Sequence, residues 1–456
     1  MVTFFVVAFF MYARTKPHMI KPWRQVPRSK VGVISMMVLS LYVAIALLDS
    51  VHFHPKLIKL NQSSDEVLYS GEIVSLFDQL VDNLRNSSEK TYSAPFAAYL
   101  YAKETINLPD GTQQRIYPRL TWGASHLSDP ENEKQADILK LALVGAMKAA
   151  IMWLGLMLLL CIYKSVRHKE SFTNVLNSIV GGQSEIPWRT FAITLAIILL
   201  VLLIGAEWAS KYHVLGTDKV GEDVLYQALK SIRTGVLIGT LTTILVLPLA
   251  IVLGIMAGFF RGWVDDVIQY IYTTLNSIPG ILLIAAAVLM LEVHMNNNAE
   301  QFSSLTIRSD YRLLFLCLIM GLISWTGLCR LLRAESLKLR EVEFVQAATA
   351  FGVGPMQTIF KHILPNVMHI VLITVVLDFS GLVMAEAVLA YVNIGVDPTM
   401  NSWGNMINSA RLQMAREPIV WWSLAASLFF MFTLVLFANL FADVVRDALD
   451  PRIAKQ

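Results

Sequence analysis

Apolar residues in this chain are gathered into eight long runs, which are separated by shorter polar segments. An α-helix rises about 1.5 Å per residue, so about 20 apolar residues cross the ~30 Å hydrocarbon layer of a membrane. Each run has about this length or more. The pattern therefore predicts an all-α integral membrane protein with about eight transmembrane helices, over residues 31–49, 141–163, 190–208, 234–260, 265–292, 311–331, 367–391 and 419–443.

The Lys and Arg residues of the short loops predict which side of the membrane each loop occupies. Basic residues close to helix ends stay in the cytoplasm. They are frequent in residues 1–30, in the loops at 164–189 and 332–366, and at the C-terminal end. We therefore expect both termini to be cytoplasmic and the long segment 50–140 to lie outside. Residues 1–13 are apolar but too short to span a membrane, and we interpret them as an interfacial segment or a consequence of start-site choice.

Composition excludes several classes of protein. Hydrophobic residues make up 55% of the chain and charged residues 16%, which does not suit a single soluble core. The net charge of +3 is too small to indicate a nucleic-acid-binding protein. The three cysteines lack the spacing of a disulfide framework or metal site. Phosphate-binding-loop, zinc-protease and serine-hydrolase motifs do not occur in the sequence, so we expect no catalytic residues, no metal site and no directly bound cofactor.

The segment 50–140 has a pattern of its own. Ile73, Phe77, Leu80 and Leu84 recur at helical spacing. The sequence PDG is typical of a turn, and it lies between the segments ETINL and QQRIYP. These features predict a small cap made of a helix and a hairpin. A loosely ordered connector is the other interpretation.

Residues 344–366, FVQAATAFGVGPMQTIFKHILPN, separate two predicted spans and have a mixed pattern. Good helix formers extend over residues 334–351, Gly352 and Gly354 interrupt them, and Pro355 suits the first turn of a new helix. The pattern predicts two short helices joined by a tight bend. Because alanines leave room for a partner to approach the backbone, we interpret this segment as a docking element. An amphipathic helix on the membrane surface is the alternative.

The run QAATAFG, followed nine residues later by HILP, resembles the cytoplasmic signature of permease subunits in binding-protein-dependent ABC importers. In that family the signature folds as coupling helices that dock on ATPase subunits. The resemblance implies coupling helices within residues 334–366 and no ATPase site in this chain. Gln and His stand at two positions where the family has Glu and Ile. The docking residues that the resemblance implies are Gln346, Ala347, Ala348, Gly352, Gly354, His362, Leu364 and Pro365.

Four further blocks follow the order seen in the second, C-type permease of dipeptide and oligopeptide importers. They are LGTDKVGEDVL (215–225), AGFFRGWVDD (257–266), the block at 384–407, and DVVRDALDPR (443–452). The resemblance implies a permease core of six helices preceded by an addition. The domains expected on this basis are a cytoplasmic N-terminal segment 1–30, an added transmembrane hairpin 31–163 with the external cap 50–140, a cytoplasmic linker 164–189, and a permease domain 190–456.

The resemblance also implies a mechanism and a set of partners. An extracytoplasmic substrate-binding protein delivers substrate to this chain and a second permease subunit in the bacterial inner membrane. Two cytoplasmic ATPase subunits bind ATP and Mg, and the coupling helices transmit their closure. Such importers carry dipeptides, oligopeptides, antimicrobial peptides or nickel complexes, and the sequence does not choose among these. We take peptides as the commonest case.

Ionisable residues inside predicted spans are costly if they face lipid. Asp378 lies within the seventh span and Glu386 near its outer end. One interpretation places both in the transport pathway or at the interface with the second permease. The other pairs Asp378 within the helix bundle and leaves Glu386 at the membrane interface. Lys148 lies one or two turns inside the second span, where its side chain can extend outward to water.

Two other kinds of residue stand out near the spans. Asp218 and Asp223 belong to the external block at 215–225, and we interpret them as helix-start and surface residues. Pro248 and Pro279 lie within predicted spans, where proline kinks a helix. These kinks suit either gating or packing.

Two other classes of protein remain open at this point. A secondary transporter would be driven by an ion gradient and would usually show internal repeats and charges at the membrane midplane. A membrane-anchored receptor or interaction protein would use the cap at residues 50–140 as its working part. We find no convincing repeat between the halves of the chain, and the ordered blocks favour the importer.

Overall fold

The computed structural model describes residues 25–449, with gaps at 56–69, 72, 108–112, 170, 182–184 and 303. The predicted interfacial segment 1–13 and the PDG turn therefore lie outside the described residues.

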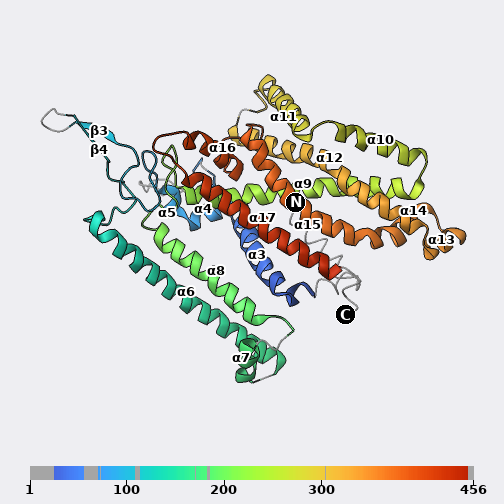
Figure 1. Cartoon of the computed structure of the whole chain (residues 1–456), viewed down its shortest axis with the longest axis horizontal. Coiled ribbons are helices and arrows are strands. Elements are labelled where there is room, and N and C mark those ends of the chain that lie inside the picture. Colours follow the sequence, from blue (N-terminus) through green and yellow to red (C-terminus); the bar gives the residue numbers. More distant parts are fainter. Residues whose placement is uncertain are drawn as a thin grey trace, which may run out of the picture. The chain divides into compact units, whose positions relative to one another are not determined.

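Most of the described chain is helical (Figure 1), and eight of its helical segments are long and apolar enough to cross a membrane. This confirms the expectation of an all-α membrane protein. One segment joins the short α14 to α15 and runs over Pro355–Tyr391. The long helices are α3 (Lys30–Ser50), α6 (Pro130–His168), α8 (Trp188–Ala209), α9 (Val224–Phe260), α11 (Gly280–Asn297), α12 (Leu305–Arg340), α15 (Leu364–Tyr391) and α17 (Trp422–Leu449).

The prediction of one continuous span over residues 265–292 is wrong. The structure has two helices there, α10 (Trp263–Ser277) and α11, and Ile278 between them is extended. A residue that precedes proline is pushed away from helical geometry by the proline ring, and Pro279 follows Ile278 directly. Pro248, by contrast, lies inside α9, which continues through it.

The chain forms two compact units, which we describe separately. The first unit contains residues 25–26, 235–400 and 438–449 of the described chain. The second contains residues 27–234 and 401–437. The second unit thus holds the segments predicted as the added hairpin and cap together with the first part of α9. It also holds the helices α7 (Phe172–Gly181) and α16 (Trp403–Met414). The last two residues of the short helix η1 (Val26–Arg28) belong to this unit as well.

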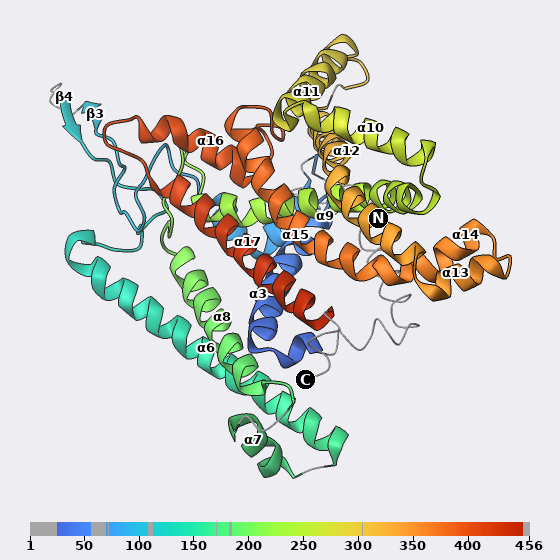
Figure 2. The ribbon, with the colours of Figure 1, turned by 45° about the vertical axis from the view of Figure 1, so that its right-hand side comes forward.

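Within the second unit, α6 and α8 run side by side, as both ribbon views show (Figures 1 and 2). A Cβ at Gly145 of α6 would lie 2.7 Å from the Ile204 Cα of α8, so the backbones approach as closely as glycine allows. Lys148 forms an ion pair with Glu207 on α8. The expectation that Lys148 simply extends outward is therefore incomplete, because a carboxylate on the neighbouring helix neutralises it.

The cap between α3 and α6 consists of short elements. Strands β1 (His52–Phe53) and β2 (Val74–Ser75) pair antiparallel, and so do β3 (Glu104–Asn107) and β4 (Gln113–Ile116). The second pair confirms the predicted hairpin.

The predicted cap helix is only partly right. Two short helices, α4 (Leu76–Leu80) and α5 (Asp82–Asn86), follow β2. Ser75 and Asp78 form a reciprocal capping box that starts α4, so Ile73 lies before the helix and is exposed. Leu80 is exposed as well, whereas Phe77 and Leu84 are buried.

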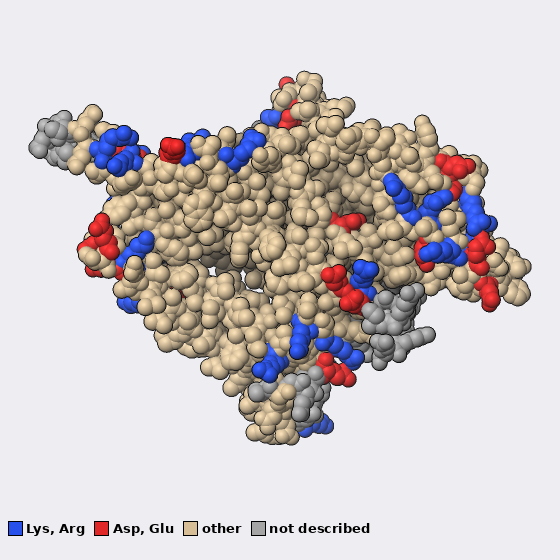
Figure 3. Space-filling view, in the orientation of Figure 1, with Lys and Arg blue, Asp and Glu red and all other residues tan. Residues whose placement is uncertain are grey.

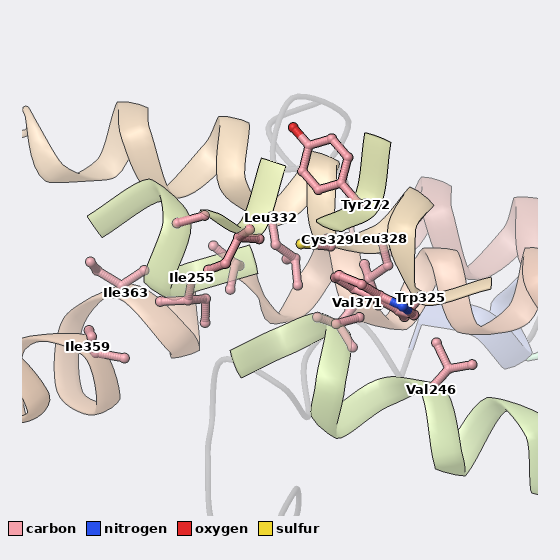
Figure 4. Packing of buried hydrophobic residues seen from close by; sticks show 14 residues of the cluster. Val246, Ile255, Tyr272, Trp325, Leu328, Cys329, Leu332, Ile359, Ile363 and Val371 are labelled. Carbon is pink, nitrogen blue, oxygen red and sulfur yellow. The ribbon is translucent and has the colours of Figure 1, made fainter. Parts of the chain in front are cut away.

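The first unit has two hydrophobic clusters along α9, α12 and α15. The coupling-end cluster, shown in Figure 4, contains Val246, Ala250, Ile255, Ala257, Ile268, Tyr272, Trp325, Leu328, Cys329, Leu332, Ile359, Ile363, Val367 and Val371. The distal cluster contains Ile238, Ile284, Val288, Leu313, Leu316, Cys317, Met320, Leu382, Leu389 and Val396. The three cysteines of the chain are buried and unbridged, which fits their interpretation as small hydrophobic residues.

Candidate functional site

The predicted docking segment is a short helix, a bend and a second short helix after the end of α12. Helix α13 spans Glu343–Ala350 and is separated from α12 by an extended residue, Val342. Val345 is almost fully buried and anchors α13 to the protein. The end of α12 is held in turn by Arg340, which donates to the Phe259 carbonyl oxygen at 3.0 Å. The helix formers of residues 334–351 are thus divided between α12 and α13.

The bend has the geometry of a Schellman motif. The Val353 N–H donates to the Ala348 carbonyl and the Gly352 N–H to the Thr349 carbonyl, both at 3.0 Å. Gly352 has φ of +79°, the left-handed conformation that this motif requires and that glycine adopts without strain. The local reason for Gly352 is therefore to end α13.

The second half of the segment depends on two prolines. Gly354 is the N-cap of α14 (Pro355–Thr358), and Pro355 takes the first helical position. A π-helical segment, η2 (Ile359–Ile363), then leads into α15. Pro365 has no N–H, and its ring would clash with the carbonyl four residues earlier in an ordinary α-helix. The wider π turn is the backbone's response to this proline.

The outer surface of this segment is apolar. Phe351 at the bend is 88% exposed, and Phe360 is 66% exposed. Met356 and Phe344 are also exposed. The alanine pattern pointed to the segment but missed these four side chains, although three large aromatic residues around a glycine bend are a signal for a binding surface. We call Phe344, Phe351, Met356 and Phe360 the docking face.

The predicted docking residues divide into an exposed and a supporting group. Gln346 and Ala347 are exposed and Ala348 is half-buried on α13, while Gly352 and Gly354 have open space around them. The supporting group is half-buried: the His362 ring lies 6.1 Å from the Phe344 ring between centroids, and Leu364 and Pro365 lie at the start of α15.

An ion pair connects α10 to α12 close to this end of the first unit. Arg333 donates from Nε and Nη2 to the two carboxylate oxygens of Asp265, at 2.6 and 2.7 Å. These hydrogen bonds hold the pKa of Asp265 below its usual value. Asp265 belongs to the sequence block at 257–266, and this geometry gives the carboxylate a positioning role.

The two ionisable residues singled out in the seventh span differ in environment. Glu386 is buried on α15. Asp378 is half-buried near the middle of α15, and among the described residues no hydrogen bond or ion pair forms with its carboxylate. The described part of this chain therefore does not show the alternative in which Asp378 is paired within the helix bundle.

The second unit contains a buried charge cluster that the sequence reasoning missed. His213 Nδ1 lies 2.7 Å from Asp223 Oδ2, and His213 Nε2 lies 3.4 Å from Glu89 Oε1. Glu89 also accepts hydrogen bonds from the backbone N–H groups of Thr121 and Trp122, at 2.9 and 2.8 Å. All three charged side chains are at most 3% exposed.

Electrostatics and hydrogen bonds set the charge states of this cluster. Burial alone would lower the pKa of His213, but the hydrogen bond to Asp223 and the Glu89 carboxylate outweigh it and raise the pKa to about 9. Burial would raise the pKa of Glu89, yet His213 and the surrounding donors lower it to about 2. The cluster is therefore charged at neutral pH.

Asp223 and Asp218 lie at the start of α9, as predicted. Asp223 Oδ1 accepts the backbone N–H groups of Leu225 and Tyr226 at 2.8 and 3.1 Å. It is not a surface residue, however, because its side chain is buried against His213. Asp218 is half-buried and accepts hydrogen bonds within the turn before α9.

A second ion pair of the same unit connects the cap to α9. Lys230 Nζ lies 2.7 Å from Asp78 Oδ1, and the Tyr226 hydroxyl donates to the same oxygen at 2.8 Å. Burial would raise the pKa of Asp78, but these donors hold it at about 2. No group of three or more potential metal ligands occurs in the described residues.

Comparison with known proteins adds the family. Residues 250–455 match the model of the binding-protein-dependent transport system inner membrane component. The oligopeptide transport system permease protein OppC of Haemophilus influenzae is 29% identical over 252 residues, which are 55% of this chain and 74% of that protein. The glutathione transport system permease protein GsiD of Pectobacterium atrosepticum is 27% identical over 297 residues, an alignment that covers 59% of this chain and 92% of that protein. The dipeptide transport system permease protein DppC of Lactococcus lactis is 29% identical over 251 residues, an alignment that covers 55% of this chain and 67% of that protein.

Proposed function

We propose that this chain, whose residues 250–455 are an inner-membrane component of the binding-protein-dependent transport family, forms half of the translocation pathway of an ATP-driven peptide importer. The family resemblance inferred from the sequence blocks is confirmed by this match. The chain is a multi-pass membrane permease subunit, and such subunits are not enzymes themselves. The observation that carries the proposal is the α13–α14 bend with its exposed docking face in the matched region.

The substrate class follows from the names of the relatives. The three described above are permeases for oligopeptides, glutathione and dipeptides, and all of these substrates are short peptides or peptide-like. A free amino group and a carboxylate are the features that such substrates share. Peptides are therefore the class that we assign to this chain.

The docking face is the surface on which an ATPase subunit would bind. Gly352 and Gly354 have no neighbouring atom within 4 Å of an added Cβ, so nothing in the described chain covers the bend. A partner that packs on Phe351 would bury a large aromatic side chain now in water. Movement of that partner would be transmitted through α13 and η2 into α12 and α15, which contact these elements.

The partners follow from the family. A binding-protein-dependent permease requires a substrate-binding protein and ATPase subunits. We propose the fuller assembly of this chain, a second permease subunit, two ATPase subunits that hold ATP and Mg, and one extracytoplasmic binding protein.

The charge distribution supports a cytoplasmic position for the bend and for both termini. Lys and Arg, with Asp and Glu among them, lie over the end of the first unit that carries α13 and α14 (Figure 3). This end of α12 contains Arg330, Arg333, Lys338 and Arg340. Basic residues at helix ends are retained on the cytoplasmic side. With eight spans, the N-terminal segment 1–30 and the C-terminal end then share that side, and the cap lies outside.

The domain division inferred from the sequence stays part of the proposal. Residues 31–163 would be an added hairpin with the cap, 164–189 a cytoplasmic linker and 190–456 the permease domain. The curated relatives align with only 52–59% of this chain, which is compatible with an N-terminal addition.

The test is a pull-down of the tagged chain from its native membranes in mild detergent, compared with Gly352→Asp, Gly352→Asn and Phe351→Asp. We expect the wild type to recover a second permease and ATPase subunits. Gly352→Asp and Phe351→Asp should lose only the ATPases, because each places a charge in the docking face. Gly352→Asn is the matched control, since Asn tolerates the left-handed conformation and adds no charge.

Two results would contradict the proposal. The first is recovery of the ATPases by Phe351→Asp at the wild-type level, which would remove the docking assignment. The second is peptide uptake that survives ATP depletion but collapses with the proton gradient, which would make the chain a secondary transporter.

A further inference from the structure

A layer that belongs to neither hydrophobic cluster crosses the first unit where its two clusters meet. Along α9, residues 242–245 separate Leu241, which packs on the distal cluster, from Val246 of the coupling-end cluster. Along α15, residues 376–381 separate Val375, which packs on the coupling-end cluster, from Leu382 of the distal cluster. Polar residues therefore interrupt the two clusters on α9 and α15, and on α12 the layer borders Trp325, the first residue of the coupling-end cluster on that helix.

The three helices are in direct contact at this level. A Cβ at Gly239 of α9 would lie 2.5 Å from the ring of Phe379 on α15. A Cβ at Gly321 of α12 would lie 3.6 Å from the Thr242 carbonyl oxygen on α9. Helices α12 and α15 therefore both pack on α9 at this level.

All three helices carry buried polar atoms that make no hydrogen bond to nitrogen or oxygen in the described chain. On α9 this is the Thr242 hydroxyl, which is fully buried and has only the weakly hydrogen-bonding Cys317 thiol beside it, and on α12 it is the Trp325 indole nitrogen, whose side chain is 2% exposed. The Ser336 hydroxyl on α12 and the Ser380 hydroxyl on α15 are in the same state. The neighbouring Thr240 and Thr243 hydroxyls donate to carbonyls of their own helix at 2.7 Å. An unsatisfied buried polar group is unfavourable, so Thr242 and Trp325 need an explanation that Thr240 and Thr243 do not.

Asp378 supplies the third group, from α15. It follows Val371 by seven residues and precedes Leu382 by four, so all three lie on one side of the helix, the side of both clusters. Val371 and Leu382 are buried, but Asp378 is only half-buried and has no partner among the described residues. A carboxylate near the middle of a membrane helix persists only where water or a partner reaches it.

We propose that Asp378, Thr242 and Trp325 form a recognition layer that holds a peptide midway through the pathway. The inference rests on the proposed function as a peptide permease. The Asp378 carboxylate would take the ammonium group of the peptide's N-terminus, which is the stronger, charge-assisted interaction. The Trp325 N–H and the Thr242 hydroxyl would donate to peptide carbonyl oxygens. Binding of a peptide would give the buried Thr242 and Trp325 polar atoms the hydrogen-bond partners that the described chain does not supply.

The experiment uses proteoliposomes containing the complete importer with its binding protein. Uptake is measured for a pool of random tripeptides and for the same pool acetylated at the N-terminus. The variants are Asp378→Asn, Asp378→Glu, Thr242→Val and the matched control Thr243→Val. Thermal stability of each purified complex is recorded in parallel, so that a defect in assembly is recognised.

We expect wild-type uptake of the free pool to exceed uptake of the acetylated pool by about tenfold or more. Asp378→Asn should abolish this preference, and Asp378→Glu should restore most of it. Thr242→Val should lower uptake of both pools about threefold or more without loss of thermal stability, because the hydroxyl makes no hydrogen bond to nitrogen or oxygen in the described chain. Thr243→Val should leave uptake unchanged.

The failures of the two proposals are distinguishable. If the wild type imports neither pool, peptide import itself is contradicted. If Asp378→Asn keeps the wild-type preference for the free pool, the carboxylate does not bind the amino group. If Asp378→Asn instead loses the second permease subunit from the purified complex, Asp378 is an interface residue and the recognition layer is wrong.

Discussion

Two groups of buried polar side chains, one in each unit, differ in how far they are paired. In the second unit, Glu89, His213 and Asp223 are buried, and each faces an opposite charge. In the first unit, the Thr242 hydroxyl and the Trp325 indole nitrogen are buried without a hydrogen-bond partner. Paired charges hold one arrangement of the chain, whereas unpaired polar atoms are satisfied only when something else arrives. The cluster of Glu89, His213 and Asp223 thus holds one arrangement, whereas the recognition layer that we propose in the first unit would receive a ligand.

The largest effect should come from His213→Leu. Two buried carboxylates, Glu89 and Asp223, would lose their positive partner, and an uncompensated buried charge costs about 3–5 kcal/mol. We expect a large drop in the unfolding temperature of the purified protein, measured by intrinsic fluorescence. Glu222→Gln at an exposed position is the control and should have little effect. An unchanged midpoint for His213→Leu would mean that the cluster does not stabilise the second unit.

A change of pH should act through the same histidine. The pKa of His213 is raised from 6.5 to about 9, so its stabilising contribution is complete below pH 6.5 and is lost as pH rises through 9. The lowered pKa of Glu89 gives the opposite dependence, with stability lost only as pH falls from 4.5 towards 2. We expect the unfolding temperature to fall between pH 7 and pH 10. The corresponding decrease in the free energy of unfolding is on the order of 3 kcal/mol. In His213→Gln the unfolding temperature should fall less over this pH range, because the contribution of His213 is missing. An equal pH dependence in the variant and the wild type would mean that His213 does not cause it.

A smaller effect should follow from Lys230→Met. The side chain of Lys230 is 21% exposed, so water compensates part of the charge that its removal leaves on Asp78. We expect a loss of about 1–3 kcal/mol. The double variant Lys230→Met with Asp78→Asn should recover most of this loss. A double-mutant cycle with no coupling energy would show that the two charges do not interact.

The smallest effect on stability should be that of Thr242→Val. Its hydroxyl makes no hydrogen bond to nitrogen or oxygen in the described chain, so an isosteric methyl group should leave the unfolding temperature unchanged or slightly raised. Thr243→Val, which removes a hydrogen bond to the Gly239 carbonyl, should lower it by about 1 kcal/mol or less. If Thr242→Val were the more destabilising of the two, the contrast between the paired and the unpaired groups would not hold.

Much of the fold was accessible from the residues because it depends on local signals. The membrane helices follow from runs of apolar residues, and the bend follows from Gly352 and Pro355, which favour their conformations whatever surrounds them. The one failed span had a local signal as well, because Pro279 marks the break between α10 and α11. The predicted docking residues lie in one segment, residues 346–365, because they are neighbours in the chain.

The buried cluster could not be predicted in the same way. Glu89 and His213 are separated by more than a hundred residues, and neither position is apolar or part of a motif. The docking face was missed for a different reason. Phe344, Phe351 and Phe360 read as apolar residues that any helix could bury, and only the folded chain shows that they point into open space.

The sequence by itself determined that this protein is an all-α membrane protein with a bend at Gly352 between two short helices, because hydrophobic length and the conformations of glycine and proline are properties of short segments. Tertiary structure alone decided which polar groups are paired. His213 meets two carboxylates because the cap packs on the start of α9. The polar groups of Thr242 and Trp325 remain without such partners because the helices around them present apolar side chains. Pairing depends on distances between segments remote in the chain, which no pattern along the chain contains.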